Sequence, residues 1–318
     1  MNKLACLIPL ALALAACGNT NEPAAPAAST PQPATPAAAP APADQPEQPT
    51  PPQAANDLLG AKLDGILAGD WRSAANKARD QYRHPKQTLE FFGIKPGDTV
   101  IEITPGGGWY TEILAPLMKG NGTYIAAVAK PTRPDGEAAS DKAKLEQRFA
   151  ADAERYGEAK TVEFDGKAPV LGEPNSADVV VTFRNVHNWA VGGTAEAKFK
   201  AFFDVLKPGG VLGVTDHRAA PDADFGKIKD SGYLPQDMVV KFATDAGFRL
   251  VESSEINANP KDTKDYEKGV WTLPPTLQLG DKDKDKYLAI GESDRMTLKF
   301  VKPGADTIFR QPDQAQKH

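Results

Sequence analysis

Short apolar runs alternate along this chain with longer segments in which apolar residues recur every three or four positions. Runs of the first kind suit buried strands, and the clearest lie at residues 99–103, 123–129, 161–164, 178–183 and 210–215. Segments of the second kind suit amphipathic helices, and examples lie at residues 109–119, 136–156, 195–205 and 234–246. Strands that alternate with helices in this way are typical of a parallel, doubly wound sheet.

The flanking segments extend this α/β prediction. Before the first strand, apolar spacing predicts helices at 57–69 and 71–83, and a third helix begins at Pro85 and is closed by Gly93. After the helix that Gly247 closes, the remaining expected elements are a strand at 248–256, a loop rich in Pro, Asp and Lys at 257–294, and a last strand at 296–301.

A glycine cluster separates the first strand from the helix that follows it. Glu102 lies near the end of the strand, and Gly106, Gly107 and Gly108 precede the helical pattern that opens at Trp109. Glycines permit a left-handed backbone and let a ligand approach the main chain, and a helix N-terminus favours polar ligand groups. Such a strand–turn–helix unit holds nucleotide-like ligands in α/β proteins, although the same glycines also occur in plain turns.

Two further segments narrow the interpretation. Residues 177–189 predict a central strand that ends in a polar and aromatic group, and residues 206–216 read Leu-Lys-Pro-Gly-Gly before a buried strand. Together with the glycine cluster, this order resembles the class I S-adenosylmethionine (SAM)-dependent methyltransferases over residues 99–251. Residues 85–116 and 291–296 resemble a bacterial subfamily of predicted-methyltransferase lipoproteins.

The resemblance implies a fold, a cofactor and a set of site residues. The implied fold is a doubly wound, mostly parallel seven-stranded Rossmann-like sheet with N-terminal helices, whose last strand is antiparallel. Gly106, Gly107 and Gly108 would pass the methionine moiety of SAM, Glu102 would help to hold the cofactor, and Asp165 would accept from the adenine N6 amine. The residues that would line the methyl-transfer pocket follow the central strand: Arg184, Asn185, His187, Asn188 and Trp189. Of these, Arg184 and Asn185 would contact the cofactor.

Several of these residues also have a plain structural interpretation. Asp165 precedes Gly166 and suits a turn, and Trp189 suits core packing. Asn185 and Asn188 suit turns or helix caps. Both interpretations are open on the sequence alone.

Two departures from the family pattern concern the cofactor. Thr104 and Pro105 stand where the family has Gly and a small residue, so we expect a stiffer loop. Val128 stands where the family has the acid that holds the ribose hydroxyls, and Asp135 is a candidate substitute from the next loop. Loss of a bidentate carboxylate would weaken cofactor binding by roughly a few kcal/mol.

Polar residues also follow the ends of the central strands. Ligands of open α/β sheets bind beyond the carboxyl ends of the strands, and two of the four histidines, His187 and His217, lie there. His187 is predicted to act as the base that takes a proton from the methyl acceptor. Asp216 is predicted to raise the pKa of His217, which makes His217 a supporting residue.

The first residues predict export and lipid attachment. Lys3 and the apolar run at residues 4–14 are typical of a signal peptide, and the run is too short to span a bilayer. Residues 14–17 resemble a bacterial lipobox, in which Cys17 is acylated. The chain has only two cysteines, so acylation gives Cys17 a role, whereas an ordinary secretory peptide cleaved near Ala16 does not.

The predicted organisation has three parts. Residues 1–16 are a lipoprotein signal peptide, and residues 17–56 are a lipid-anchored, disordered linker rich in Pro and Ala. Residues 57–318 form the methyltransferase-like domain. Because Gly18 is not the aspartate that signals inner-membrane retention, we expect the protein on the periplasmic side of the bacterial envelope, anchored in the outer membrane.

Composition restricts the partners and leaves two function classes open. A formal net charge of −5 gives no electrostatic footprint for nucleic acid, and no zinc-type cluster is evident, so we expect neither nucleic acid nor metal. One function is a SAM-dependent methyltransferase that acts on a small or envelope-associated acceptor. The other is a non-catalytic periplasmic binding module on a degenerate methyltransferase fold. Synthesis of SAM in the cytosol favours the second, and the polar rim favours the first.

We predict that Cys17→Ser abolishes membrane attachment, because it removes the proposed acylation site. Labelling with a palmitate analogue and membrane fractionation would check this, with a labelled, membrane-bound wild type and an unlabelled variant that is unprocessed or soluble. Cys6→Ser, inside the predicted signal peptide, is the matched control. Tight membrane binding by Cys17→Ser, or a wild type that takes up no label, would contradict the prediction.

Overall fold

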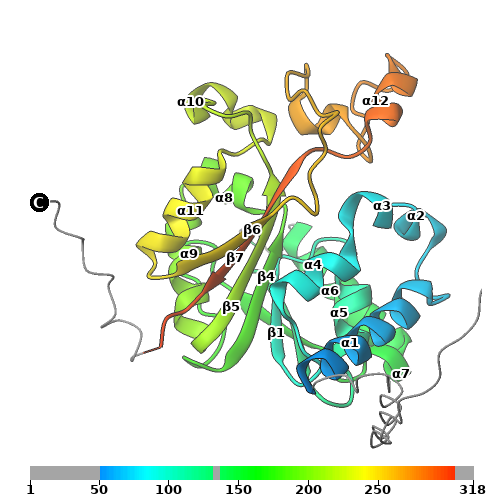
Figure 1. Cartoon of the computed structure of the whole chain (residues 1–318), viewed down its shortest axis with the longest axis vertical. Coiled ribbons are helices and arrows are strands. Elements are labelled where there is room, and N and C mark those ends of the chain that lie inside the picture. The colour runs from blue at the N-terminus through cyan, green and yellow to red at the C-terminus, as the bar shows by residue number, and fades with distance from the viewer. Residues whose placement is uncertain (1–50, 132–136, 305–318) are drawn as a thin grey trace, which may run out of the picture. The chain divides into compact units, whose positions relative to one another are not determined.

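The computed structural model of this chain describes residues 51–131 and 137–304, which contain one seven-stranded sheet (Figure 1). Its strands are β1 (Thr99–Ile103), β2 (Thr123–Ala129), β3 (Lys160–Phe164), β4 (Ala177–Phe183), β5 (Leu206–His217), β6 (Arg249–Ser254) and β7 (Arg295–Val301). They are ordered β3-β2-β1-β4-β5-β7-β6, and only β7 runs antiparallel to its neighbours. The predicted doubly wound α/β sheet with an antiparallel last strand is therefore confirmed.

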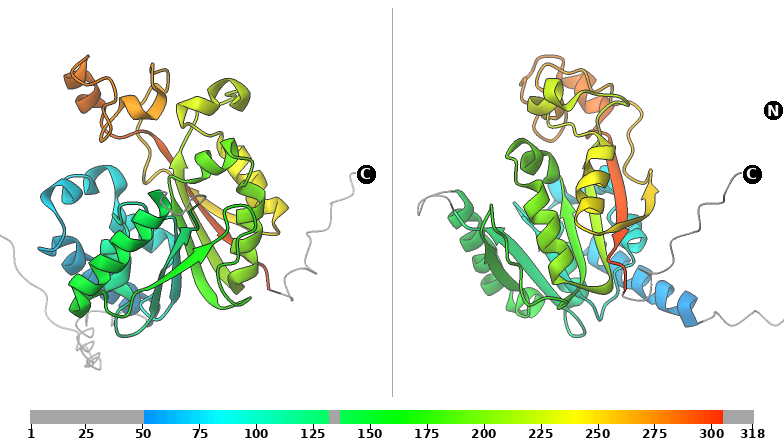
Figure 2. Two further views of the ribbon diagram at one scale, coloured as in Figure 1. Left: turned by 180° about the vertical axis from the view of Figure 1, so that it is seen from behind. Right: turned by 90° about the vertical axis from the view of Figure 1, so that its left-hand side faces the viewer.

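Helices cover both faces of the sheet (Figure 2). One face packs against α1 (Pro51–Ala68), α4 (Pro85–Phe92), α5 (Thr111–Met118), α6 (Glu137–Ala151) and α7 (Ala153–Tyr156). The other face packs against α8 (Val186–Val191), α9 (Ala195–Val205) and α11 (Gln236–Asp245). Successive strand residues alternate between the two cores, so that Val179 and Val181 contact the first group and Val180 the second.

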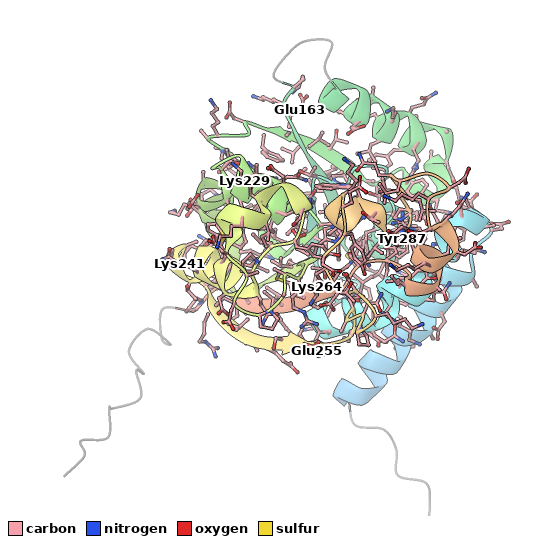
Figure 3. The ribbon with its side chains drawn as sticks, turned by 90° about the horizontal axis from the view of Figure 1, so that it is seen from above. Glu163, Lys229, Lys241, Glu255, Lys264 and Tyr287 are labelled. Atoms are coloured by element: carbon pink, nitrogen blue, oxygen red, sulfur yellow. The ribbon has the colours of Figure 1, made fainter. Side chains whose placement is uncertain are left out.

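Two segments lie over the carboxyl ends of the parallel strands, and we call residues 218–235 and 257–294 the cap. Figure 3 looks down on this edge of the sheet. Short helices form within the cap: α10 (Phe225–Ile228), η1 (Lys229–Ser231), η2 (Gly269–Thr272) and α12 (Lys284–Ile290). The two segments are joined through the Tyr233 hydroxyl, which donates to Asp262 at 2.8 Å, and through Val270 against Ala219. The sequence predicts a loop for the second segment, whereas the structure has the 3-10 helix η2 and the helix α12 there. Tertiary packing stabilises such helices, which are too short to form alone.

Two predicted helices are broken in the structure. The segment predicted as one helix at 71–83 forms α2 (Ala74–Lys77) and α3 (Asp80–Arg83). The long helix predicted at 136–156 ends at Ala151, and a new helix begins where the Asp152 side chain accepts from the Arg155 amide at 3.1 Å. An aspartate that caps a helix in this way competes with continuation of the preceding helix.

The first described helix begins earlier than the sequence predicts. It starts at Pro51 rather than at residue 57, and Pro51 and Pro52 stand in its first turn, where a missing N–H costs no hydrogen bond. The predicted signal peptide, Cys17, the linker up to residue 50 and residues 305–318 lie outside the described residues. Within 51–131 and 137–304, no helix combines the length and apolar character that a membrane crossing requires.

Candidate active site

The loop between β1 and α5, residues 104–110, is open at its centre, and we call it the glycine loop. Gly106 and Gly107 are exposed, and a Cβ atom at either would meet no other atom within 4 Å. Thr104, Gly106 and Gly108 all have left-handed backbones, with φ of 50°, 57° and 75°. A β-branched residue such as Thr104 is strained in that conformation, so the shape of the loop must be held by contacts from outside it.

Asn185 and Arg148 supply those contacts. The Asn185 amide, just beyond β4, donates to the carbonyls of Ile103 and Thr104 at 3.0 and 3.3 Å. The Arg148 guanidinium donates to the carbonyls of Gly107 and Gly108 at 3.2 Å each. Asn185, predicted as a cofactor contact, thus ties the glycine loop to β4. The sequence carried no signal for Arg148, because only the tertiary fold brings α6 to the loop.

Glu102 is buried beneath the loop with 2% of its surface exposed. Its carboxylate accepts from the Tyr124 hydroxyl at 2.6 Å and from the Thr111 hydroxyl at 3.0 Å. Burial raises the pKa of Glu102 to about 7, against the opposing effect of these two hydrogen bonds. Both bonds use the same carboxylate oxygen, Oε2, so contact between Glu102 and a cofactor stays a prediction.

Asp165 closes a turn after β3. Its side chain accepts from the amides of Lys167 and Ala168 at 2.7 and 2.9 Å, and these bonds lower its pKa. Both bonds use the same carboxylate oxygen, Oδ1, and the residue is exposed. The turn interpretation is therefore what the structure shows, while the second oxygen stays accessible to a ligand.

His187 and Asp216 form a buried pair at the carboxyl edge of the sheet. The ring Nδ1 of His187 lies 2.8 Å from Oδ1 of Asp216, and the backbone N–H of His187 donates to Oδ2 at 3.2 Å. A carboxylate acceptor at Nδ1 favours the tautomer with the proton on Nδ1, which leaves Nε2 as a proton acceptor. This pair has the arrangement of a histidine base oriented by a carboxylate.

The prediction that Asp216 raises the pKa of His217 is wrong. The Asp216 carboxylate instead pairs with the His187 ring, and only the backbone N–H of His217 donates to it. The His217 ring instead contacts the Ser293 hydroxyl. Burial, followed by the charges of His187 and three arginines, lowers the pKa of His217 well below its usual range, so His217 is neutral.

The structure brings together a group of potential metal ligands that the sequence analysis did not expect. Ligand atoms of His187, Asp216 and His217 all lie within 4.8 Å of one another, and all three residues are buried. Two histidines and a carboxylate are a common ligand set for divalent iron. The Asp216 carboxylate, however, already accepts three hydrogen bonds, so the group is better arranged for proton transfer than for metal binding.

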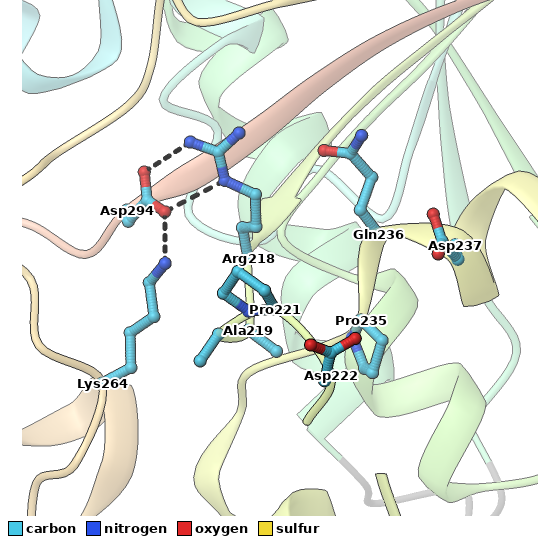
Figure 4. Close-up of a pocket in the computed structure, with 10 residues that line it drawn as sticks. Arg218, Ala219, Pro221, Asp222, Pro235, Gln236, Asp237, Lys264 and Asp294 are labelled. Carbon is cyan, nitrogen blue, oxygen red and sulfur yellow. Dashed lines mark hydrogen bonds and ion pairs between the residues drawn. The ribbon is translucent and has the colours of Figure 1, made fainter. Parts of the chain in front are cut away.

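The cap encloses this pair and forms a cavity next to it. The indole of Trp271 lies 6.5 Å from the His187 ring, edge to face, and the His217 ring lies 5.2 Å away on another side. Immediately after His217, a cavity of about 510 Å³ opens at the end of β5 (Figure 4). Arg218 and Lys264 on its wall both bind Asp294, at 3.0 and 2.8 Å.

The other predicted residues divide between surface, core and cap. Asn188 is exposed, and Trp189 packs in the core 5.8 Å from the Phe202 ring, so the packing interpretation of Trp189 holds. Arg184 has a left-handed φ of 61° and lines a small buried cavity. Val128 is buried near the end of β2, and Asp135 lies outside the described residues.

Comparison with known proteins identifies the fold. No family model matches the chain, and a search of curated proteins also finds no match. Among solved structures, the cyclase SpnF has 15% sequence identity and a TM-score of 0.50, over 80% of this chain and 97% of that one.

Two further solved structures are similar at lower scores. A SAM-dependent methyltransferase from Aquifex aeolicus has 13% identity and a TM-score of 0.48, over 76% of this chain and 98% of that one. Phosphoethanolamine N-methyltransferase 2 from Haemonchus contortus, in complex with SAM, has 16% identity and a TM-score of 0.47, over 76% and 60%. The likeness to SpnF, at 15% identity, shows a shared fold alone, and activity has to be argued from the site.

We predict that Glu102 makes stability fall as the pH rises from about 4.5 to about 7. Between its ordinary pKa and its folded value of about 7, the folded protein holds a proton that the unfolded chain has released. A shift of this size corresponds to roughly 3 kcal/mol, and Glu102→Gln lacks it. Urea unfolding at pH 5 and pH 8 should therefore show the variant gaining stability relative to wild type by up to that amount.

Asp165→Asn is the matched control for this measurement. The pKa of Asp165 is lowered, so its titration affects stability only below about pH 4 and leaves the chosen window unchanged. Parallel pH profiles for wild type and Glu102→Gln would show that Glu102 is ionised at pH 5 in the folded protein.

Proposed function

We propose that this protein is a SAM-dependent methyltransferase that acts on a small or envelope-associated acceptor. The observation that carries the proposal is an open glycine loop, tied by Asn185 to the carboxyl edge of the sheet, beside the buried His187–Asp216 pair. The resemblance of the sequence to class I methyltransferases, and to a bacterial lipoprotein subfamily of them, supports the same chemistry.

The glycine loop has the properties that a nucleoside cofactor needs. Gly106 and Gly107 present backbone without side chains in open space, which permits a ligand to lie directly on the main chain. Asp165 at the end of β3 keeps one carboxylate oxygen for an amine. The described residues at the end of β2, up to Pro131, carry no acid for the ribose hydroxyls, so that contact must come from elsewhere. When bound, SAM supplies an electrophilic methyl group.

His187 is the proposed base for the acceptor. Asp216 holds the ring through Nδ1, so Nε2 can take the proton that a hydroxyl or amine acceptor loses as it is methylated. The positive charge that His187 then gains is balanced by the Asp216 carboxylate. His217, kept neutral by burial, contributes shape and a weakly polar wall rather than charge.

An acceptor must enter past the cap. His187 is 6% exposed under Trp271, and the cavity at the end of β5 begins one residue after His217. Trp271 lines a separate cavity of about 520 Å³ within the cap, and we propose its displacement as the step that exposes Nε2 to an entering acceptor. Exclusion of water by such a cover limits side reactions of the methyl donor.

The lipid anchor at Cys17 and the periplasmic location are part of the same proposal, and they require SAM to reach that side of the envelope. The near-complete cover over His187 favours the alternative, a binding module that retains the pocket without the reaction. The two functions differ in one measurable respect, because only the enzyme transfers the methyl group.

We predict that the purified protein binds SAM and that Gly107→Val abolishes binding without unfolding the protein. Gly107 does not have a left-handed backbone, and a Cβ there meets no protein atom, so valine should be tolerated by the fold while covering the surface proposed for the ligand. Calorimetric titration with SAM would check this, with circular dichroism to verify folding. Gly97→Val, where a Cβ also meets nothing, is the control. No heat with wild type up to millimolar SAM would reject the cofactor.

We predict that His187→Ala lowers methyl transfer by roughly 10²–10⁴-fold and leaves SAM affinity nearly unchanged, whereas His217→Ala costs less. Transfer of a tritiated methyl group from SAM to an envelope fraction would provide the assay. Normal turnover by His187→Ala would contradict its role as base. Binding of SAM by the wild type without transfer to any fraction would favour the binding module.

A further inference from the structure

Four arginines gather around one carboxylate between the N-terminal helices and the sheet. Glu292 in the cap accepts from Arg79 at 2.5 Å and from Arg83 at 3.4 Å, and it also pairs with Arg295. The fourth arginine, Arg184, makes no hydrogen bond through its side chain within residues 51–131 and 137–304. We call Arg79, Arg83, Arg184 and Arg295 the arginine cluster.

The cluster borders a cavity of about 10 Å³, which has room for roughly one water molecule or one ligand oxygen. Its walls are formed by Arg83, Tyr110, Phe183, Arg184, Thr215, Asn257 and Arg295. Four side chains on this wall have buried polar atoms without a partner among the described residues: Nη2 of Arg83, Nε of Arg295, Oγ1 of Thr215 and Oδ1 of Asn257. Each of these residues is at least 95% buried, so the missing hydrogen bonds are not replaced by bulk water.

Both the excess of positive charge and the unpartnered hydrogen-bond donors around this cavity favour binding of an anion. Glu292 is the one carboxylate that these guanidinium groups contact among the described residues, Asp216 acts on Arg184 without contact, and buried unpaired charge is costly. The pKa of Arg184 reflects these surroundings. Burial, and then the charges of Arg295 and Arg79, lower it to about 10. Burial would raise the pKa of Glu292, but Arg295, Arg83 and Arg79 hold it well below its usual range.

We propose that the arginine cluster binds an oxyanion, with one oxygen in the cavity between Arg83, Arg295 and Thr215. Guanidinium groups recognise carboxylate and phosphate oxygens through charge-assisted hydrogen bonds, and the Thr215 hydroxyl adds a third donor. The unpartnered Oδ1 of Asn257 can accept a hydrogen bond from a P–OH group, which suits a hydrogen phosphate or a phosphate monoester. Arg184, half-buried at the edge, closes on the part of the ligand that remains outside.

The oxyanion belongs either to a free ion or to a larger ligand of the neighbouring active site. The cluster is close enough that Arg83, Arg184 and Arg295 all affect the pKa of His217, although Thr215 and Asp216 point to opposite faces of the sheet. Binding of a simple oxyanion does not depend on methyl transfer, so this proposal and the proposed enzyme activity can fail separately.

The test is a calorimetric and thermal-shift titration of the full protein with inorganic phosphate, and with acetate for comparison, at constant ionic strength. We expect saturable binding by wild type. Thr215→Val replaces an unpartnered buried hydroxyl by a methyl group of similar size, so it should keep or raise the apo melting temperature while weakening phosphate binding about ten-fold. Thr215→Ser keeps the hydroxyl and should therefore bind phosphate about as tightly as the wild type. Arg184→Gln should also weaken it about ten-fold or more.

Arg249→Gln is the matched control, because it removes the same charge from an exposed position at the opposite end of the sheet and should leave binding unchanged. Repeating the phosphate titration with SAM present identifies the source: competition assigns the oxyanion to the cofactor's carboxylate, and independent binding assigns it to a separate ion or acceptor. Absence of saturable binding by wild type, or equal affinity in wild type and Thr215→Val, would overturn the proposal and show that the cavity holds only water.

Discussion

The alternation of side chains at the end of β5 decides how the polar groups of this protein are divided. Thr215 faces the N-terminal helices and the arginine cluster, whereas Asp216, the next residue, faces α8 and holds His187. The parallel register that pairs Phe183 with Thr215 places the two strand ends at the same height. A slip of one residue in that register would move each side chain of β5 to the opposite face of the sheet and separate the residues of both clusters.

Buried polar groups at this edge are supported by neighbours from distant parts of the chain. Glu102 is buried with the Tyr124 and Thr111 hydroxyls as donors, and Glu292 with arginines from the N-terminal helices and from β7. Each network ties an element of the sheet to one that covers it. Such networks are costly when half satisfied, which is why the unpartnered atoms of Thr215 and Arg83 point to a missing ligand group.

The cap contributes side chains to both clusters. It supplies Trp271 above His187, Ser293 beside His217 and Glu292 among the arginines. Glu292 is also the only carboxylate that Arg83 contacts among the described residues.

The sequence by itself determined which segments form the strands of a doubly wound sheet, because apolar runs and helical spacing are local signals that such a sheet repeats. It also placed the glycine loop, His187, His217 and Asp216 at one edge, since the carboxyl ends of parallel strands meet there. It could not pair them: Asp216 is next to His217 along the chain, but its carboxylate lies 2.8 Å from the ring of His187, which only the tertiary structure brings to it. The arginine cluster unites residues from 79 to 295, and the strand and cap contacts that assemble it exist only in the tertiary structure. Side-chain burial, which lowers the pKa of His217 and raises that of Glu102, was likewise decided by packing and not by neighbours along the chain.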